Sequence, residues 1–285
     1  MRSFISEDDI EQAILGKLFA EPFCYDILRC NPAPEARETL PDGTGRKDKK
    51  QCVLPEVLKA ALIRLNPGIP EEKINEAVKD LSRDYTGTDM TATNYALYQK
   101  IRNGIKISLR RNGKEDFDFI KLVDFQNPEN NTFTAVSQMW IQGKVYFRRP
   151  DVLVFINGLP MVFLELKNST VKVKVAYSDN LTNYKKDIPN LFAFNQICVL
   201  SNGLETRIGA FNAGYEYFFE WLKVNSEKDA LDREALQNAD SAENSSARLF
   251  VEGLLDKHRL IDYIENFVLF YQMFYFQLKL HILFL

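Results

Sequence analysis

The chain has 285 residues, with 36 lysines and arginines against 39 aspartates and glutamates, and a net charge of -3. Its 46% hydrophobic and 26% charged residues are typical of a globular protein and exclude a disordered tail, a collagen-like fibre and a disulfide-stapled miniprotein. The mild acidity also excludes a uniformly basic surface, so contacts with nucleic acid would need local basic clusters. The chain contains only two histidines, which disfavours mechanisms that need several imidazoles.

The cysteines and the N-terminus indicate a cytoplasmic protein. The four cysteines form no C-x-x-C pair and have no cluster of histidines beside them, which favours reduced structural thiols over a zinc site. The N-terminus becomes acidic where a signal peptide would need an apolar stretch, which disfavours secretion.

The first third of the chain is predicted to be mainly helical. Residues 6–20 fit an amphipathic helix with Ser6 as its N-cap and three acidic residues in its first turn. A loop rich in proline, glycine and charge follows at 31–51. Further helices are expected near 54–65, 70–84 and 90–102.

From residue 105 the hydrophobic pattern changes to that of strands, although one further helix is expected at 175–187. A turn signal, Asn157-Gly158, separates two of these strands, and Asn202-Gly203 separates another pair. The order of elements predicts a mixed α/β or α+β protein built around one central sheet. The expected strands are 105–109, 117–125, 132–142, 151–156, 159–167, 193–201 and 205–211.

The last part of the chain changes character twice. Residues 225–248 are polar and predict a helix with a flexible linker, after which an apolar helical segment begins near Leu249. From Ile264 to Leu285 the sequence is apolar enough to raise the question of a membrane span. However, Gln272 and Gln277 lie in its middle and its aromatic residues are scattered, so a buried or artificially exposed segment is favoured.

Three charged residues interrupt the two apolar strands on either side of Asn157-Gly158. The strand period of two places Glu165 and Lys167 on the same face, but the face of Asp151 depends on how the hairpin is paired. Strict pairing from a two-residue turn would set Asp151 opposite Leu164. A three-residue loop or a β-bulge would set it opposite Glu165, roughly 5 Å away between β-carbons. We predict the shifted register or a bulge.

Two carboxylates at that distance would attract a divalent cation, and oxygen ligands suit Mg²⁺. The ion would polarise a scissile phosphate and lower the pKa of bound water. Lys167 could position or deprotonate that water, or stabilise the developing negative charge. The alternative interpretation is an ordinary Glu-Lys pair on an exposed strand face, because the P-D…E-x-K pattern alone is only moderately specific.

The stretch RRPDVLVFINGLPMVFLELKN resembles the N-terminal nuclease domain of the R (motor) subunit of type I restriction enzymes, a branch of the PD-(D/E)xK nucleases. The resemblance continues through residues 185–211 and the opening helix. It implies an αβββαβ restriction-endonuclease-like core, with a central mixed sheet flanked by helices and extra N-terminal helices. The positions that match the family pattern are Arg149, Pro150, Asp151, Asn157, Gly158, Leu159, Pro160, Glu165, Leu166, Lys167 and Asn168.

The resemblance also implies roles for individual residues. Asp151, Glu165 and Lys167 would be catalytic, with the two acids holding Mg²⁺ for hydrolysis of DNA phosphodiester bonds. The family has a downstream helix with the motif Q-x-x-x-Y, which Tyr184 matches, whereas Asn180 replaces the longer glutamine and puts its positioning in doubt. The first helix of the family can supply a further acid near the metal. Glu11 is the first candidate and Glu7 the second, against the alternative of a solvated helix face.

Basic clusters flank the expected site and are consistent with double-stranded DNA as a partner, because phosphate contacts give affinity without sequence specificity. No recognition helix is evident, which fits a nuclease whose specificity lies in another subunit. Solvated surface is the alternative for each cluster. The clusters are Arg46, Lys47, Lys49 and Lys50 in the long loop, Arg110 and Arg111, Arg148 and Arg149, and Lys185 and Lys186.

The resemblance predicts how the chain divides. We expect an endonuclease domain at 1–222, a polar helical or linker segment at 223–248, and the start of a following motor domain at 249–285, truncated with an aberrant tail from about 272. No G-x-x-x-x-G-K-[ST] motif is present, and Asn112-Gly113-Lys114 fits a turn, so ATP would be used only by a motor region absent here. Specificity and methyltransferase subunits would be the protein partners, and no membrane contact is expected. The alternatives are a free-standing repair or mobile-element nuclease of this superfamily, or a catalytically silent DNA-binding or assembly module.

Overall fold

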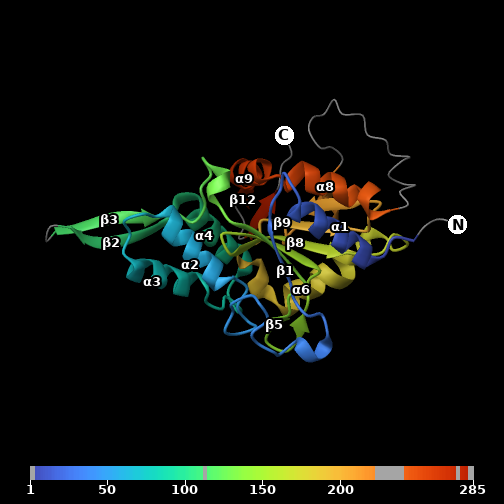
Figure 1. Ribbon diagram of the computed structural model, residues 1–285, viewed down its shortest axis with the longest axis horizontal. Coiled ribbons are helices and arrows are strands. Elements are labelled where there is room, and N and C mark those ends of the chain that lie inside the picture. Colours follow the sequence, from blue (N-terminus) through green and yellow to red (C-terminus); the bar gives the residue numbers. More distant parts are fainter. Residues whose placement is uncertain (1–3, 112–113, 222–240, 274–276, 282–285) are drawn as a thin grey trace.

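The computed structural model describes residues 4–111, 114–221, 241–273 and 277–281. A seven-stranded mixed sheet runs through the molecule in the order β1-β4-β7-β8-β9-β10-β11, with helices on both sides (Figure 1). The pairs β1–β4 and β8–β9 are parallel and the other pairs are antiparallel. The strands are β1 (Asp26–Arg29), β4 (Phe133–Ser137), β7 (Val152–Ile156), β8 (Leu159–Leu166), β9 (Ile197–Ser201), β10 (Thr206–Gly209) and β11 (Phe219–Glu220).

The predicted αβββαβ core is confirmed. It consists of α1 (Glu7–Phe19), the strands β4, β7 and β8, a helical segment at 173–187, and β9. Helix α1 starts where the sequence predicts, because the Ser6 hydroxyl accepts a hydrogen bond from the Asp9 amide and the Asp9 carboxylate accepts one from the Ser6 amide. The 173–187 segment is continuous but irregular, with α5 (Val173–Val175), a π-helical stretch η3 (Ala176–Leu181) and α6 (Thr182–Asp187).

Three extra helices and a hairpin precede the core strands. The helices α2 (Pro55–Leu65), α3 (Glu71–Leu81) and α4 (Met90–Asn103) lie close to the ranges predicted from sequence. The strands β2 (Ile105–Arg111) and β3 (Lys114–Ile120) form a hairpin that projects from the body of the molecule (Figure 1). The predicted strand at 117–125 therefore starts and ends earlier than expected.

The predicted strand at 132–142 is two strands, because the chain bends after Ser137. The second piece, β5 (Ile141–Gln142), pairs with β6 (Phe147–Arg148) in a small separate sheet. Short 3₁₀ helices complete this part of the fold: η1 (Pro34–Ala36), η2 (Pro128–Asn130), η4 (Pro189–Ala193) and η5 (Tyr215–Tyr217).

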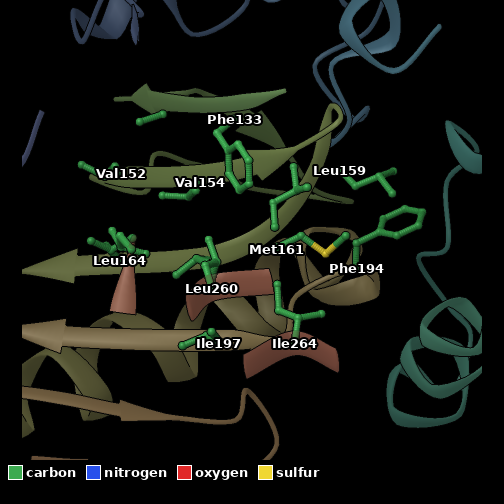
Figure 2. Packing of buried hydrophobic residues seen from close by; sticks show 14 of the residues in the cluster. Phe133, Val152, Val154, Leu159, Met161, Leu164, Phe194, Ile197, Leu260 and Ile264 are labelled. Atoms are coloured by element: carbon green, nitrogen blue, oxygen red, sulfur yellow. The ribbon is translucent and has the colours of Figure 1, made fainter. Parts of the chain in front are cut away.

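The central strands β7 and β8 are buried along their whole length, and their side chains alternate between two hydrophobic clusters. Val154 and Leu164 belong to the cluster on one face of the sheet, whereas Leu153 and Phe163 belong to the cluster on the other. Figure 2 shows Leu260 of a C-terminal helix packed near Leu164 on the first face. Because both faces of these strands are buried, a charged side chain on them is costly unless it is paired or binds a metal ion.

The C-terminal region packs into the same core as the sheet. After η6 (Ala242–Asn244), α8 (Ser246–Leu254) begins three residues before the predicted Leu249, and α9 (Lys257–Asn266) follows. Phe250 of α8 and Leu260 of α9 are fully buried in the cluster that contains Val154. The domain boundary expected at 249 stays a prediction, but it does not coincide with a break in the hydrophobic core.

The structure describes only part of the other segments predicted near the C-terminus. Most of the polar segment predicted as helix and linker falls at 222–240, outside the described residues. The apolar segment that starts at Ile264 begins in α9 and continues into a hairpin of β12 (Leu269–Met273) and β13 (Gln277–His281). Within the described ranges, no helix has the length and apolar character needed to cross a bilayer.

Candidate active site

A β-bulge in the β7–β8 hairpin sets the orientation of Asp151. Ile156 and Leu159 pair across a two-residue turn in which Asn157 and Gly158 have φ values of 51° and 80°. The register shifts one pair further on, between Val154 and Phe155 of β7. Beyond the shift Val152 pairs with Leu164, so the next position along places Asp151 opposite Glu165. The predicted bulge is confirmed, and both carboxylates lie on one face of the sheet.

The turn that starts this register requires glycine. A β-carbon on Gly158 would lie 2.6 Å from the carbonyl oxygen of Leu54 and 2.7 Å from the amide nitrogen of Leu58, at a positive φ. The Leu54 amide also donates to the Gly158 carbonyl at 2.9 Å. Helix α2 is thus packed directly on the turn, which fixes one end of the hairpin that carries the acids at its other end.

The structure brings Asp151, Glu165 and Lys167 together. Glu165 is 1% exposed, and its Oε1 lies 3.0 Å from Nζ of Lys167. Nζ of Lys167 also donates to the carbonyl oxygen of Leu166 at 2.7 Å, and Oδ2 of Asp151 accepts from the amide of Leu166 at 2.7 Å. Asp151 is therefore tied to the backbone of the strand that carries the other two residues, in a buried cluster and not on an exposed strand face.

The first helix adds a third acid. Glu11 is buried, so it does not lie on a solvated helix face, and its Oε2 accepts a hydrogen bond from Nε2 of Gln138. The same nitrogen of Gln138 lies 3.4 Å from Oδ1 of Asp151. Glu7 is more exposed and reaches Lys167 only at 3.9 Å. No motif in the sequence marks Gln138 as part of the site.

Tyr184 and Asn180 come from the irregular helix that covers this end of the sheet. The Tyr184 ring contacts Phe163 edge-on, with 5.6 Å between ring centroids, and its hydroxyl donates to the carbonyl oxygen of Arg149 at 3.2 Å. Burial and the charge of Glu165 raise the pKa of Tyr184, so it stays a neutral donor. Asn180 lies in the π-helical stretch, near enough to Tyr184 for its side chain to counteract part of this rise in pKa. Such π-helical irregularities are frequent at functional sites.

The site has an excess of negative charge in a buried place. Burial, followed by the charge of Asp151, raises the pKa of Glu165 well above its usual value. Burial likewise raises the pKa values of Asp151 and Glu11. Burial lowers the pKa of Lys167, but the charge and hydrogen bond of Glu165, together with the charges of Glu7 and Asp151, outweigh burial and raise the pKa overall. One lysine therefore faces three acids, and a bound cation would relieve their repulsion.

The acids fit Mg²⁺ better than they fit a metal held only by protein. Oε2 of Glu165 is buried and has no hydrogen-bond partner, which leaves one carboxylate oxygen available as a ligand. No group of three or more His, Cys, Asp or Glu side chains among the described residues has the arrangement of a metal site. Because Mg²⁺ keeps several waters and commonly takes only one or two carboxylates, the Asp151–Glu165 pair suffices.

The prediction that the basic residues of the long loop face DNA is wrong for two of them. Arg46 and Lys49 are each 4% exposed, and both contact Oδ2 of Asp42 at 2.7 Å. Arg46 also donates to the carbonyl oxygens of Gln51 and Trp140. A buried carboxylate needs cationic partners, so these side chains hold the loop together and are not presented to DNA. Lys47 and Lys50 remain exposed.

The clusters beside the site are partly engaged within the protein. Nε of Arg148 lies 2.7 Å from Oδ2 of the buried Asp187. The guanidinium of Arg149 lies over the Trp140 ring at 5.1 Å. In the described structure Lys186 is exposed, whereas Lys185 is half-buried with its ammonium 5.2 Å from the Tyr177 ring.

The Arg110–Arg111 pair does not flank the site. Leu122, just after β3, accepts a hydrogen bond from the side chain of Asn157, so the hairpin begins at the turn end of β8. The carboxylates lie at the other end of this strand, about 20 Å away. Arg110 is exposed on the projecting hairpin, and the side chain of Arg111 lies outside the described residues.

Residues 4–217 match the family described as the N terminus of the type I restriction enzyme R protein. The chain belongs to this family. It is 32% identical over 278 residues to the type I restriction enzyme HindI endonuclease subunit of Haemophilus influenzae, covering 93% of the chain and 24% of that relative.

A second relative supports the same family membership. The chain is 30% identical over 245 residues to a putative type I restriction enzyme MjaIXP endonuclease subunit of Methanocaldococcus jannaschii, covering 81% of the chain and 23% of the relative. The chain thus spans about a quarter of the length of these two relatives.

Proposed function

We propose that this chain is the nuclease region of a type I restriction enzyme R subunit and hydrolyses DNA phosphodiester bonds with Mg²⁺. The observation that carries the proposal is the β-bulge that places Asp151 opposite Glu165, with Lys167 3.0 Å from Glu165. The relatives support it, because they are named as endonuclease subunits of type I restriction enzymes.

In the proposed reaction, Asp151 and Glu165 would be the residues that hold the cation. The chemistry that Mg²⁺ supplies when bound is polarisation of the scissile phosphate and a lower pKa for water beside it. Lys167 donates from its ammonium to the attacking water or to the phosphate oxygens as negative charge develops. Tyr184, with Asn180 beside it, holds the backbone at Arg149 and so positions the neighbouring Asp151.

The remaining functions belong to the proposed complete enzyme. We infer that cutting occurs on double-stranded DNA in the cytoplasm, in a complex with specificity and methyltransferase subunits. ATP-driven translocation would come from a motor region outside this chain. The support is the size and naming of the relatives, which are about four times as long as the chain and are named as type I restriction enzyme subunits.

The test combines metal binding with DNA cleavage. Calorimetric titration with Mn²⁺, a substitute for Mg²⁺, should show one site in the wild type that is lost in Glu165→Gln. Plasmid nicking with Mg²⁺ should be abolished by Glu165→Gln and by Lys167→Ala. Glu72→Gln, an exposed acid on α3, is the matched control and should change neither measurement. A wild type that binds no Mn²⁺ would overturn the proposal.

A further inference from the structure

Gln138 has a backbone conformation that its residue type rarely adopts. It is one of three non-glycine residues in the described part of the chain with a positive φ, at 57°, together with Cys24 and Asn157. Asparagine tolerates this conformation because its short side chain can hydrogen-bond locally, but glutamine has no such advantage. An unusual backbone conformation that persists beside a buried acidic site suggests a function for the residue.

The position of Gln138 in the sheet is opposite Asp151. Ser137, the last residue of β4, pairs with Val152, and the Gln138 amide then donates to the Asp151 carbonyl at 2.9 Å. The ladder stops there. It resumes at Ile141 and Arg148 in the register that uninterrupted pairing would have given. The left-handed residue therefore bends the two strands without shifting their register.

The bend lets one side chain reach two elements. Asp151 projects on the face of Leu153 and Phe163, whereas α1 packs through Ile10 and Ile14 on the opposite face. A regular strand would direct Gln138 to the Asp151 face alone. With its left-handed backbone, Gln138 donates from Nε2 to Glu11 of α1 and approaches Asp151 at 3.4 Å.

We propose that Gln138 is a positioning residue that couples Glu11 to Asp151, so that the acid of the first helix acts together with the proposed metal-binding pair. This inference rests on the function proposed above. The amide suits the task because it offers two N–H donors to two acceptor-only carboxylates and adds no charge. A lysine there would neutralise part of the charge that attracts the cation. Removing a group that orients a metal ligand typically weakens metal binding by about 10- to 100-fold.

The experiment separates the amide from the backbone conformation. Gln138→Gly removes the amide but favours the positive φ, whereas Gln138→Met removes the donors and keeps the length of the side chain. Mn²⁺ affinity is measured by calorimetry and thermal unfolding is measured without metal. We expect both variants to bind Mn²⁺ about 10-fold more weakly. Gln138→Gly should nevertheless unfold within a few degrees of the wild type. Cys24→Gly, at the exposed left-handed residue after α1, is the control and should not change the affinity.

The Mn²⁺ affinities of these variants decide whether Gln138 has the proposed coupling role. Wild-type Mn²⁺ affinity in Gln138→Gly would overturn it, because a purely structural role would change only unfolding. In the Glu11→Gln background, Gln138→Gly should weaken binding less than two-fold, and a full 10-fold loss there would refute the coupling to Glu11. Glu165→Gln is titrated in parallel. If Glu165→Gln binds Mn²⁺ like the wild type, the proposed metal site is refuted. If Glu165→Gln loses Mn²⁺ binding but the Gln138 variants keep it, the metal site stands and only the role of Gln138 is refuted.

Discussion

Two clusters of charge in this protein differ in the sign of the charge that is in excess. In the loop cluster, the single carboxylate of Asp42 contacts both Arg46 and Lys49, so the cations outnumber the acid. In the site cluster, the carboxylates of Asp151 and Glu165 lie beside Lys167, so the acids outnumber the cation. The acid of the first cluster is held by two cationic partners, whereas the second cluster leaves negative charge and an unpartnered carboxylate oxygen. An acid held by cationic partners indicates a structural role, and an excess of buried acids indicates a place where a ligand acts.

The pKa values follow this difference. Burial would raise the pKa of Asp42, but hydrogen bonds from Lys49 and Thr44, with the charge of Arg46, hold it well below its usual value. At Glu165 burial and the neighbouring Asp151 act in the same direction, and the pKa is raised well above its usual value. One acid is thus stabilised as an anion and the other is destabilised.

The largest expected effect comes from removing the acid of the loop cluster. Asp42→Asn would leave the cations of Arg46 and Lys49 buried without a countercharge. We expect the free energy of unfolding to fall by about 3–5 kcal/mol, as for other buried ion pairs that lose one partner. Urea denaturation followed by circular dichroism measures this. Lys50→Gln, at an exposed position in the same loop, should cost less than about 0.5 kcal/mol. An equal cost for both variants would show that the Asp42 contacts do not hold the loop.

The matching change in the site cluster should cost far less. Glu165→Gln removes a carboxylate that burial and Asp151 destabilise, so the metal-free free energy of unfolding should change by less than about 1 kcal/mol at neutral pH. Mn²⁺ should raise the melting temperature of the wild type but not of Glu165→Gln. A loss of several kcal/mol in the metal-free variant would mean that Glu165 is a structural ion-pair partner of Lys167.

The two clusters should respond to pH with opposite signs. The folded-state pKa of Asp42 is depressed, so its contribution is present above its unfolded pKa of 3.8 and is lost as pH falls through the folded value. The folded-state pKa of Glu165 is raised, so its penalty is absent below its unfolded pKa of 4.5 and grows as pH rises towards the folded value.

Unfolding free energies measured from pH 3 to 8 against each variant test these signs. The deficit of Asp42→Asn should shrink towards the acid end. The stability of Glu165→Gln relative to the wild type should improve with rising pH. The same slope in both difference curves would contradict the assignment of the two clusters.

The contrast between the two clusters explains which features of the molecule could be predicted from the sequence and which could not. The bulge and the facing carboxylates could be predicted, because charged residues in an apolar strand are costly unless they meet, and strand alternation left only the register open. The burial of Arg46 and Lys49 could not be predicted, since a loop rich in lysine and glycine has no periodicity that marks an inside. Glu11 and Gln138 were uncertain or missed because their role depends on α1 reaching the end of β4, a contact between segments more than 100 residues apart.

The smallest expected effect concerns DNA contacts outside both clusters. Lys186 is exposed just after Tyr184, and replacing it with alanine should reduce the salt dependence of duplex binding by about one phosphate contact. Arg110 is equally exposed, but its hairpin leaves the molecule at the turn end of β8, so Arg110→Ala should not change this dependence. Fluorescence anisotropy with a short duplex at several salt concentrations measures both slopes. A larger effect at Arg110 would mean that DNA follows the projecting hairpin and not the end of the sheet where the acids meet.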